Sequence, residues 1–487
     1  MVGKDRKKQG RNLGWKPGSS VFSYWMNGNN EEKNTMEKKT MKDMTSGSPM
    51  KLILGFLIPM LFGLLFQQFY NMMDTIIVGK YLGVQALAAV GSTGSVNFMI
   101  IGFCTGVCSG FAIPVAQKFG ERNETALRRY VANGGWLAVG FSLVMTVIVC
   151  VLCRPILVLM QTPEDIIDGA YAYILVIFLG IPATYLYNLL AGIIRSLGDS
   201  KTPLFFLMIS SFMNIALDLF TILVLDMGVA GAAWATVISQ AVSGVLCLIY
   251  MKKKFVILKM QGDEWKPDKY AMTVLCGMGI PMGLQYSITA IGSVILQTAV
   301  NSLGSLAVAS VTAGSKISMF FCCPYDAMGA TMATYGGQNV GAKKLDRIDQ
   351  GIKNCVILGA GYAVIAFCVI YFFGDIVALL FVDAKETEIL ANTREFLLAN
   401  VAFYFPLALV NIFRFMIQGL GYSRFAIFAG VFEMAARTLV AFCLVPLFSY
   451  TAVCLANPCA WIAADIFLVP AYLYVMKELR RKLNWAS

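Results

Sequence analysis

Residues 52–79 read LILGFLIPMLFGLLFQQFYNMMDTIIVG, a long apolar run with a single acidic residue, Asp74. A helix of about 20 apolar residues is long enough to cross the hydrocarbon core of a bilayer. An ionised carboxylate inside such a helix costs at least ~2.5 kcal/mol on insertion scales, so it is retained only where it faces protein, water or an ion. The run therefore predicts a transmembrane helix that carries a functional carboxylate.

The composition places the whole chain in a membrane. Hydrophobic residues make up 58% of the 487 residues and charged residues only 14%, whereas about a quarter of the residues of a soluble domain are charged. Histidine is absent, which removes the commonest general base and metal ligand, and we expect no bound cofactor. The formal charge of +11 comes from basic residues in alternate loops, a pattern typical of membrane topology and not of nucleic-acid binding.

Twelve apolar runs follow one another along the chain. They cover about 52–79, 85–114, 127–152, 166–191, 203–226, 228–251, 270–302, 306–335, 348–373, 388–418, 424–447 and 451–476. Basic residues cluster after the even-numbered runs, as with Arg195 and Lys201 after the fourth, and are scarce after the odd-numbered ones. Because cytoplasmic loops carry the excess of Lys and Arg, both termini are predicted to be cytoplasmic in a multi-pass protein of the cell membrane.

The second six runs repeat the first six at an offset near 220 residues. Matching pairs include Pro59 and Pro281, Gln117 and Gln338, Pro182 and Pro406, and Trp234 and Trp461. Halves that each contain an even number of helices have the same orientation, so this is a parallel repeat about an axis along the membrane normal. We predict an all-α membrane protein of twelve transmembrane helices, arranged in two parallel-repeat six-helix bundles around a central cavity.

The polar segments divide the chain into five parts. We expect a disordered basic cytoplasmic tail over 1–49, an N-terminal bundle over 50–251, a cytoplasmic linker over 252–269, a C-terminal bundle over 270–476 and a cytoplasmic tail over 477–487. The first part is polar and basic with little apolar content, which is typical of a disordered segment. We expect the chain to act as a monomer in the lipid bilayer.

Three helices of the first half carry polar side chains at similar depths. If the first helix runs outward, Asp74 lies about five residues, or ~8 Å, from its outer end. Asn214 and Asp218 are spaced i, i+4 and share one face of the outward-running fifth helix, and Thr236 lies at a comparable depth on the sixth. Two carboxylates, an amide oxygen and a hydroxyl suit a small hard cation or a shared proton. We therefore predict that these four residues bind the coupling ion, and the choice between H⁺ and Na⁺ stays open.

The second half carries other charged residues inside its apolar runs. Glu433 and Arg437 are spaced i, i+4, which favours a structural ion pair. Asp326 and Asp465 have no partner in the local sequence and are candidates for contact with a cationic substrate. A substrate cavity is expected to offer hydrogen bonds and cation–π contacts to organic cations. Its candidate residues are Gln67, Tyr70, Asn71, Tyr187, Tyr286 and Asp326.

Four motifs are distributed over both halves of the chain. They are Pro59–Gly79, Gly198–Pro203, Gly228–Thr236 and Gly337–Ala342. Together they resemble the multidrug and toxic compound extrusion (MATE) family, and the resemblance extends over about 50–476. It implies a V-shaped pair of six-helix bundles that exports organic cations in exchange for protons or sodium ions.

The resemblance also implies roles for particular residues. In members with a cation site in the first bundle, the positions that form it match Asp74, Asn214, Asp218 and Thr236 of this sequence. Pro59 and Gly63 match the point at which the first helix bends in some members. A hinge there is physically reasonable, because proline cannot donate the helical hydrogen bond.

Other classes of protein fit the sequence less well. A flippase for lipids or lipid-linked saccharides would need a strongly cationic cavity for phosphates, which the acidic groups here argue against. A major-facilitator transporter would share the twelve helices, but its Asp-Arg-x-Gly-Arg loop is replaced by Gln117–Arg122. An intramembrane enzyme would need a His-Glu-x-x-His motif, a nucleophile with its base or a phosphate loop, and the sequence contains none of these. We therefore predict a transporter and not an enzyme.

Overall fold

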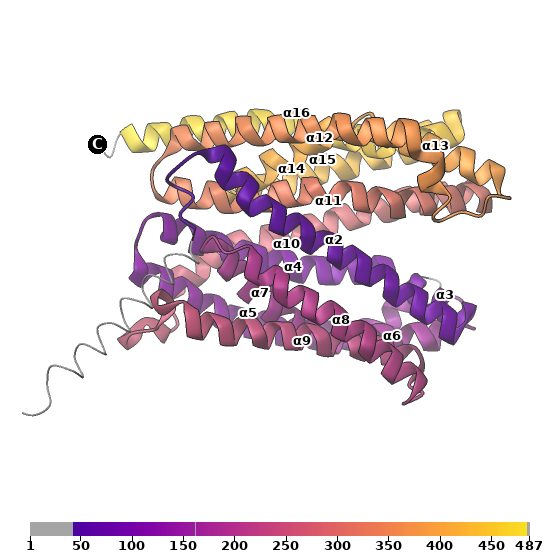
Figure 1. Cartoon of the computed structure of the whole chain (residues 1–487), viewed down its shortest axis with the longest axis horizontal. Helices are drawn as coiled ribbons and strands as arrows, with labels where there is room; N and C mark the ends of the chain where they lie inside the picture. Colours follow the sequence, from indigo (N-terminus) through magenta and orange to yellow (C-terminus); the bar gives the residue numbers. More distant parts are fainter. Residues whose placement is uncertain (1–41, 161, 485–487) are drawn as a thin grey trace, which may run out of the picture. The chain divides into compact units, whose positions relative to one another are not determined.

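The computed structural model describes residues 42–160 and 162–484. All the regular secondary structure in these two ranges is helical, and most helices run side by side along the long axis of Figure 1. This confirms the predicted fold class. The hydrocarbon core of a bilayer contains no water to hydrogen-bond with backbone N–H and C=O groups. A helix satisfies these groups internally and is therefore stable there.

The helices of the first half build what we call the first bundle. They are α2 (Pro49–Leu82), α3 (Val84–Ser92), α4 (Gly94–Gly120), α5 (Glu124–Leu159), α6 (Ile167–Leu179), α7 (Ile181–Ser196), α8 (Lys201–Leu223) and α9 (Gly228–Lys254). Two 3₁₀ turns follow, η1 (Val256–Leu258) and η2 (Gly262–Trp265). The second bundle contains α10 (Lys269–Ser302), α11 (Ser305–Gly341), α12 (Leu345–Ala378), α13 (Thr387–Val401), α14 (Tyr404–Gly419), α15 (Arg424–Leu439), the π-helical η3 (Val440–Leu444) and α16 (Val445–Asn484).

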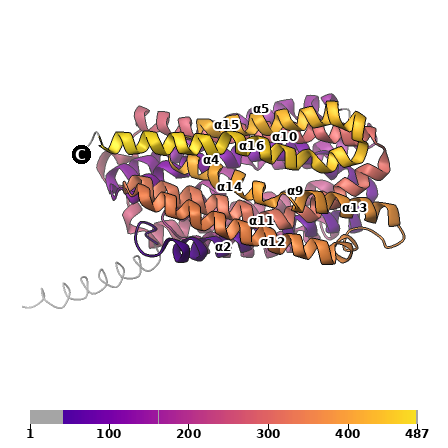
Figure 2. The ribbon, with the colours of Figure 1, turned by 90° about the horizontal axis from the view of Figure 1, so that it is seen from above.

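The number of membrane crossings agrees with the prediction. Nine helical stretches of the described residues are long and apolar enough to cross a membrane, and two bent helix pairs raise the number to eleven. One of these stretches, Arg424–Leu483, has 60 residues and would be ~90 Å long if straight, about three times the hydrocarbon thickness. It turns at Ser449, where φ is 51°, and α15 packs alongside α16 (Figure 2). The stretch therefore holds two crossings, and the total for the described residues is twelve.

Two bends occur at equivalent places in the repeat. The angle between α6 and α7 is 45°, and the angle between α13 and α14 is 50°. Pro182 lies in the first turn of α7 and Pro406 in the first turn of α14, and each lacks the amide hydrogen that would continue the preceding helix. The sequence analysis gives each pair as one apolar run, 166–191 and 388–418, and does not predict the bend, because the apolar composition does not change there.

The first helix of each half contributes to both bundles. Ile53 and Phe56, near the start of α2, belong to the same buried cluster as Tyr325 of α11, whereas the rest of α2 packs against α8. Figure 1 shows α2 running obliquely from α11 and α12 toward α6 and α8. Its repeat mate α10 likewise packs against both α4 and α15. Pro59 and Gly63 lie in the part of α2 that touches both bundles, because Met60 packs on the buried cluster of Tyr325 and a Cβ atom on Gly63 would lie 3.7 Å from Leu204 of α8.

The two bundles meet at a symmetric joint at their predicted cytoplasmic end. Gln117 of α4 donates a hydrogen bond of 2.9 Å from Nε2 to the carbonyl oxygen of Gly419. Its repeat mate Gln338 of α11 donates an equivalent bond of 2.9 Å to the carbonyl oxygen of Ser196. Each bundle therefore provides one amide donor and one carbonyl acceptor to the other. We call this contact the glutamine joint.

Two glycines allow the backbones to meet at the glutamine joint. A Cβ atom on Gly120 would lie 1.9 Å from the carbonyl oxygen of Gln338. A Cβ atom on Gly341 would lie 1.9 Å from the carbonyl oxygen of Gln117. No side chain larger than hydrogen fits at either position without separating α4 from α11. Gly120 and Gly341 are therefore part of the joint.

The segment Asp43–Gly47 lies against the same joint. The Met44 amide donates to Oε1 of Gln338 at 2.8 Å, and Arg347 donates from Nη1 to the carbonyl oxygen of Gly47 at 2.9 Å. Met44 is completely buried. The prediction of a disordered tail over 1–49 therefore does not hold for residues 43–48, and residues 1–41 lie outside the described part of the chain. At the other end, α16 continues through 477–484, where a tail was predicted, and 485–487 are not among the described residues.

The predicted linker 252–269 is fixed to α5. Glu264 accepts a hydrogen bond of 2.8 Å from Nε of Arg128, and both side chains are buried. Nearby, Nε1 of Trp136 donates to the carbonyl oxygen of Trp265 at 3.0 Å. The connection between the bundles is therefore anchored to the first one.

Replacing Glu264 with glutamine is expected to lower the free energy of unfolding by about 1–3 kcal/mol, because a buried charge-assisted hydrogen bond is lost. The hydrogen bond from Arg128 holds the pKa of Glu264 below its usual range. A depressed carboxyl pKa gives stability that is present above the unfolded pKa of ~4.3 and is lost as the pH falls through the folded pKa. Thermal unfolding at several pH values should show that this acid-dependent loss is smaller in Glu264→Gln. The control is Glu124→Gln, because Glu124 also pairs with Arg128, at 3.3 Å, but its side chain is 61% exposed.

Candidate cation site and first-bundle cavity

Helix α8 turns its polar residues toward the protein. The buried residues on it are Pro203, Ser210, Ser211, Asn214, Asp218, Thr221 and Ile222. Spacings of three and four place the polar members of this set on one face. Large apolar residues such as Phe205, Phe212 and Phe220 are exposed instead. This distribution suits a helix in lipid, where polar side chains are retained only in the protein interior.

Asn214 and Thr236 are brought together from α8 and α9. Nδ2 of Asn214 donates to Oγ1 of Thr236 over 3.4 Å, and Asn214 is only 1% exposed. The bond uses the amide nitrogen and leaves Oδ1 of Asn214 without a hydrogen-bond donor among the described residues. An acceptor oxygen is therefore available at the contact between α8 and α9.

The two carboxylates complete an oxygen-rich group. Asp218 is fully buried and interacts electrostatically with Asp74 of α2, and both also interact with the buried Tyr173 of α6. Within the described residues, Oδ1 of Asp74, Oδ1 of Asn214 and both carboxylate oxygens of Asp218 are buried without a hydrogen-bond partner. Buried polar atoms are rarely left in this state, because an unmade hydrogen bond carries the full cost of desolvation. This donor set fits a small cation or a proton.

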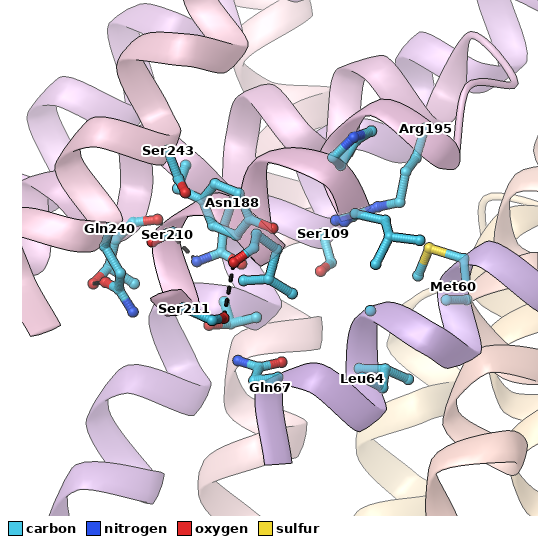
Figure 3. Close-up of a pocket in the computed structure, with 18 of the residues that line it drawn as sticks. Met60, Leu64, Gln67, Ser109, Asn188, Arg195, Ser210, Ser211, Gln240 and Ser243 are labelled. Carbon is cyan, nitrogen blue, oxygen red and sulfur yellow. Dashed lines mark hydrogen bonds between the residues drawn. The ribbon is translucent and has the colours of Figure 1, made fainter. Parts of the chain in front are cut away.

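A cavity of about 260 Å³ adjoins this oxygen-rich group. Figure 3 shows residues that line the cavity. Its walls come mainly from α2, α4, α7, α8 and α9. Among the residues singled out from the sequence, Pro59, Gly63, Gln67, Tyr70, Tyr187, Asn214 and Thr236 line it. Asn214 and Thr236 belong both to the cavity wall and to the oxygen-rich group. A molecule in the cavity and an ion at the carboxylates would therefore share these two residues.

Three of the residues expected in a substrate cavity do not line this one. Asn71 is exposed on α2. Tyr286 of α10 packs on α4, where its ring lies close to Gly106. Asp326 lies on α11 in the second bundle. Sequence periodicity gave no means of separating residues on the cavity side of a helix from those on its other faces.

The charged residues of the second bundle form a cluster. Glu433 pairs with Arg437 at 3.6 Å, as the sequence suggested, and it also binds Arg414 of α14. Asp326 and Asp465 both interact electrostatically with Arg414. Oδ1 of Asp465 is buried without a hydrogen-bond partner among the described residues. Arg414, which the sequence analysis did not consider, is therefore an internal cation beside the two aspartates that had been candidates for contact with a cationic substrate.

The sequence analysis also missed Arg195. It was assigned to a cytoplasmic loop, but it lies in the last turn of α7 and lines the cavity. Thr184 and Asn188 line the cavity from the same helix. Asn188 and Arg195 follow Thr184 by four and eleven residues, spacings that place all three side chains on one face of the helix. This pattern in the sequence could have identified Arg195 as a cavity residue.

Comparisons with known proteins agree with this architecture. The MatE family model matches residues 59–220 and 281–443, one segment in each half of the chain. The chain belongs to the MatE family. This membership confirms the prediction of a membrane transporter and not an enzyme, and the two matched segments correspond to the two halves of the repeat.

Individual relatives of this MatE-family transporter cover most of its length. It is 29% identical over 346 residues to "Probable multidrug resistance protein YoeA" of Bacillus subtilis, which covers 69% of this chain and 74% of that protein. It is 28% identical to "Probable multidrug resistance protein YpnP" of the same organism, covering 78% of this chain and 83% of that one. A solved structure of an outward-facing multidrug resistance MATE family transporter superposes with a TM-score of 0.84 at 21% identity, covering 91% of this chain and 99% of that one.

Proposed function

We propose that this MatE-family transporter exports drug-like organic molecules, organic cations among them, across the cell membrane in exchange for H⁺ or Na⁺. The observation that carries the proposal is the group of buried, unpartnered oxygens of Asp74, Asn214 and Asp218 beside the cavity. The names of the two Bacillus relatives also favour drug export over the flippase alternative.

The coupling ion would bind at Asp74, Asn214, Asp218 and Thr236. A proton or Na⁺ there neutralises carboxylates that otherwise repel each other in a region of low dielectric constant. Asp74 lies on α2, and α2 packs in both bundles, with Pro59 and Gly63 at the crossing. A change in the shape of α2 on ion binding would therefore alter the packing between the bundles.

Linkage then determines how export is driven. If the ion and the exported molecule stabilise different conformations, each weakens the binding of the other by the same factor. The shared residues Asn214 and Thr236 provide a direct route for this competition. We also propose that the protein acts as a monomer, because one chain supplies the whole cavity, and that both termini are cytoplasmic.

The proposal is tested with purified protein in proteoliposomes. Ethidium movement is recorded while a pH gradient or a Na⁺ gradient is imposed separately, with an ionophore that collapses each gradient as the control. We expect ethidium transport to follow one of the two gradients and to stop when that gradient is collapsed. Ethidium flux that is independent of both gradients would contradict coupled antiport, and movement of fluorescent lipid without movement of ethidium would favour a flippase.

A further inference from the structure

The first-bundle cavity carries one charged side chain, and it is basic. Among the described residues that line the cavity, Arg195 is the one that bears a charge. The carboxylates Asp74 and Asp218 are not part of the lining. Figure 3 shows Arg195 beside Met60 and Ser109, with Gln240 and Ser243 toward the opposite side of the cavity.

The guanidinium group of Arg195 is not neutralised within the protein. No ion pair joins it to a carboxylate within 42–160 and 162–484. Its electrostatic neighbours are Tyr187, Cys247 and Cys108, which are uncharged at neutral pH. The alternative is that Arg195 merely offsets the helix dipole or fixes the membrane topology, as a basic residue at the end of a helix can do. Lys201, six residues later, fits that role, because it is exposed.

The nearest acidic residue in the sequence is occupied elsewhere. Oδ1 of Asp199 accepts hydrogen bonds from the amides of Lys201 and Thr202, at 3.0 and 3.1 Å. Its Oδ2 accepts from Oγ1 of Thr202 at 2.7 Å and from the hydroxyl of Tyr250 at 3.0 Å. Both oxygens of Asp199 are thus engaged at the start of α8. The five donors of Arg195 remain available to a molecule in the cavity.

We propose that the first-bundle cavity binds small amphiphilic molecules through a carboxylate, which Arg195 receives. A guanidinium group presents parallel N–H donors that match the two oxygens of a carboxylate. Leu64, Leu204 and Phe415 of the cavity wall provide apolar contacts, and Gln67 and Asn188 provide hydrogen bonds for the rest of the molecule. The proposal rests on the proposed transport function and names the residue of this chain that would recognise a negative group on the bound molecule.

The test compares two dyes that differ at one group. Rhodamine B has a free carboxylate, and in its ethyl ester that carboxylate is blocked. Equilibrium dialysis of both dyes against the full-length protein in neutral detergent, with detergent alone as the blank, gives the two affinities without any ion gradient. Wild-type protein is expected to bind the free acid more tightly than the ester, and equal affinities would overturn the proposal.

The variants assign the preference to Arg195. Arg195→Gln should weaken binding of the free acid by about tenfold, the effect of losing a charged hydrogen bond, and leave the ester unchanged. Arg195→Lys keeps the charge but loses the paired donors, so a smaller loss is expected, and it serves if the glutamine variant does not fold. Lys201→Gln is the matched control and should change neither affinity. An equal loss for both dyes in Arg195→Gln, or no loss for either, would overturn the proposal.

The binding measurement is also independent of ion coupling. Asp218→Asn is expected to stop gradient-driven export, but it leaves the lining of the cavity intact and should keep the preference for the free acid. If wild-type protein prefers the free acid but shows no coupled transport, the proposed function fails and the cavity assignment stands. If transport is coupled but wild-type protein shows no preference for the free acid, the cavity assignment fails and the proposed function stands.

Discussion

Replacing Asp218 with asparagine is expected to reduce gradient-driven ethidium export to the level of protein-free liposomes. Asparagine has the shape of aspartate, but its amide neither takes up a proton at physiological pH nor offers a negative charge to Na⁺. Asp218 is fully buried, and neither of its carboxylate oxygens has a hydrogen-bond partner in the described structure. Asp74→Asn should have the same effect, because its carboxylate interacts with that of Asp218.

Binding of the ion can be followed apart from transport. A ligand that binds only the folded state raises the melting temperature with its concentration. Wild-type protein should therefore be stabilised either by Na⁺ or by a lower pH, and Asp218→Asn should lose that response. The matched control is Asp168→Asn, which removes an acid of the same bundle whose side chain is 83% exposed. Unchanged export by Asp218→Asn in the presence of a gradient would refute the assignment of the coupling site.

Gly120→Ala is expected to open the glutamine joint and to reduce export strongly. The added Cβ would lie 1.9 Å from the carbonyl oxygen of Gln338, so α4 and α11 must separate by ~1.5 Å to reach an ordinary contact distance. The hydrogen bonds from Gln117 and Gln338, which join the two bundles, would then be stretched or broken. The proposed antiport requires the protein to open to each side of the membrane in turn, so this end must be able to close, and a joint that cannot close would stop transport.

Hydrogen exchange reports on the joint directly. The Met44 amide is protected by its bond to Gln338, so peptides that contain Met44 and Thr45 should exchange faster in Gly120→Ala. Gly341→Ala should behave in the same way, because it occupies the equivalent place in the repeat. In Gly140→Ala the new Cβ would meet no atom within 4 Å, and both exchange and export should match those of the wild type. Normal protection and normal export in Gly120→Ala would contradict the proposed role of the joint.

The sequence predicted the helices better than their arrangement. Apolar runs and repeated residues gave the twelve crossings and the two parallel halves, because lipid requires long helices and duplication preserves landmarks such as Gln117 and Gln338. The repeat did not show that Gln117 and Gln338 each form a hydrogen bond to the other bundle, since a match between two positions in the sequence says nothing about their distance in space. The bends at Pro182 and Pro406 were missed because both sides of each bend are equally apolar.

For the candidate site, the sequence likewise predicted one part better than the other. Asp74, Asn214, Asp218 and Thr236 could be named from the sequence because polar groups are rare and expensive in a membrane helix. The cavity was harder to predict, because aromatic residues serve lipid contact, packing and binding alike. Arg195 was misplaced for a further reason. Its charge at the end of an apolar run has the usual appearance of a topological signal, whereas in the structure α7 continues to Ser196 and Arg195 lines the cavity.

The crossing of α2 between the bundles has a consequence for biosynthesis. Ile53 and Phe56 enter the membrane early, whereas Tyr325 and the rest of the cluster that finally buries them are made much later. Until then lipid must cover these side chains, which it does at little cost because they are apolar. The start of α2 therefore leaves its contact with lipid and packs against protein only after the second half of the chain has been inserted. Its docking is thus a late step of folding.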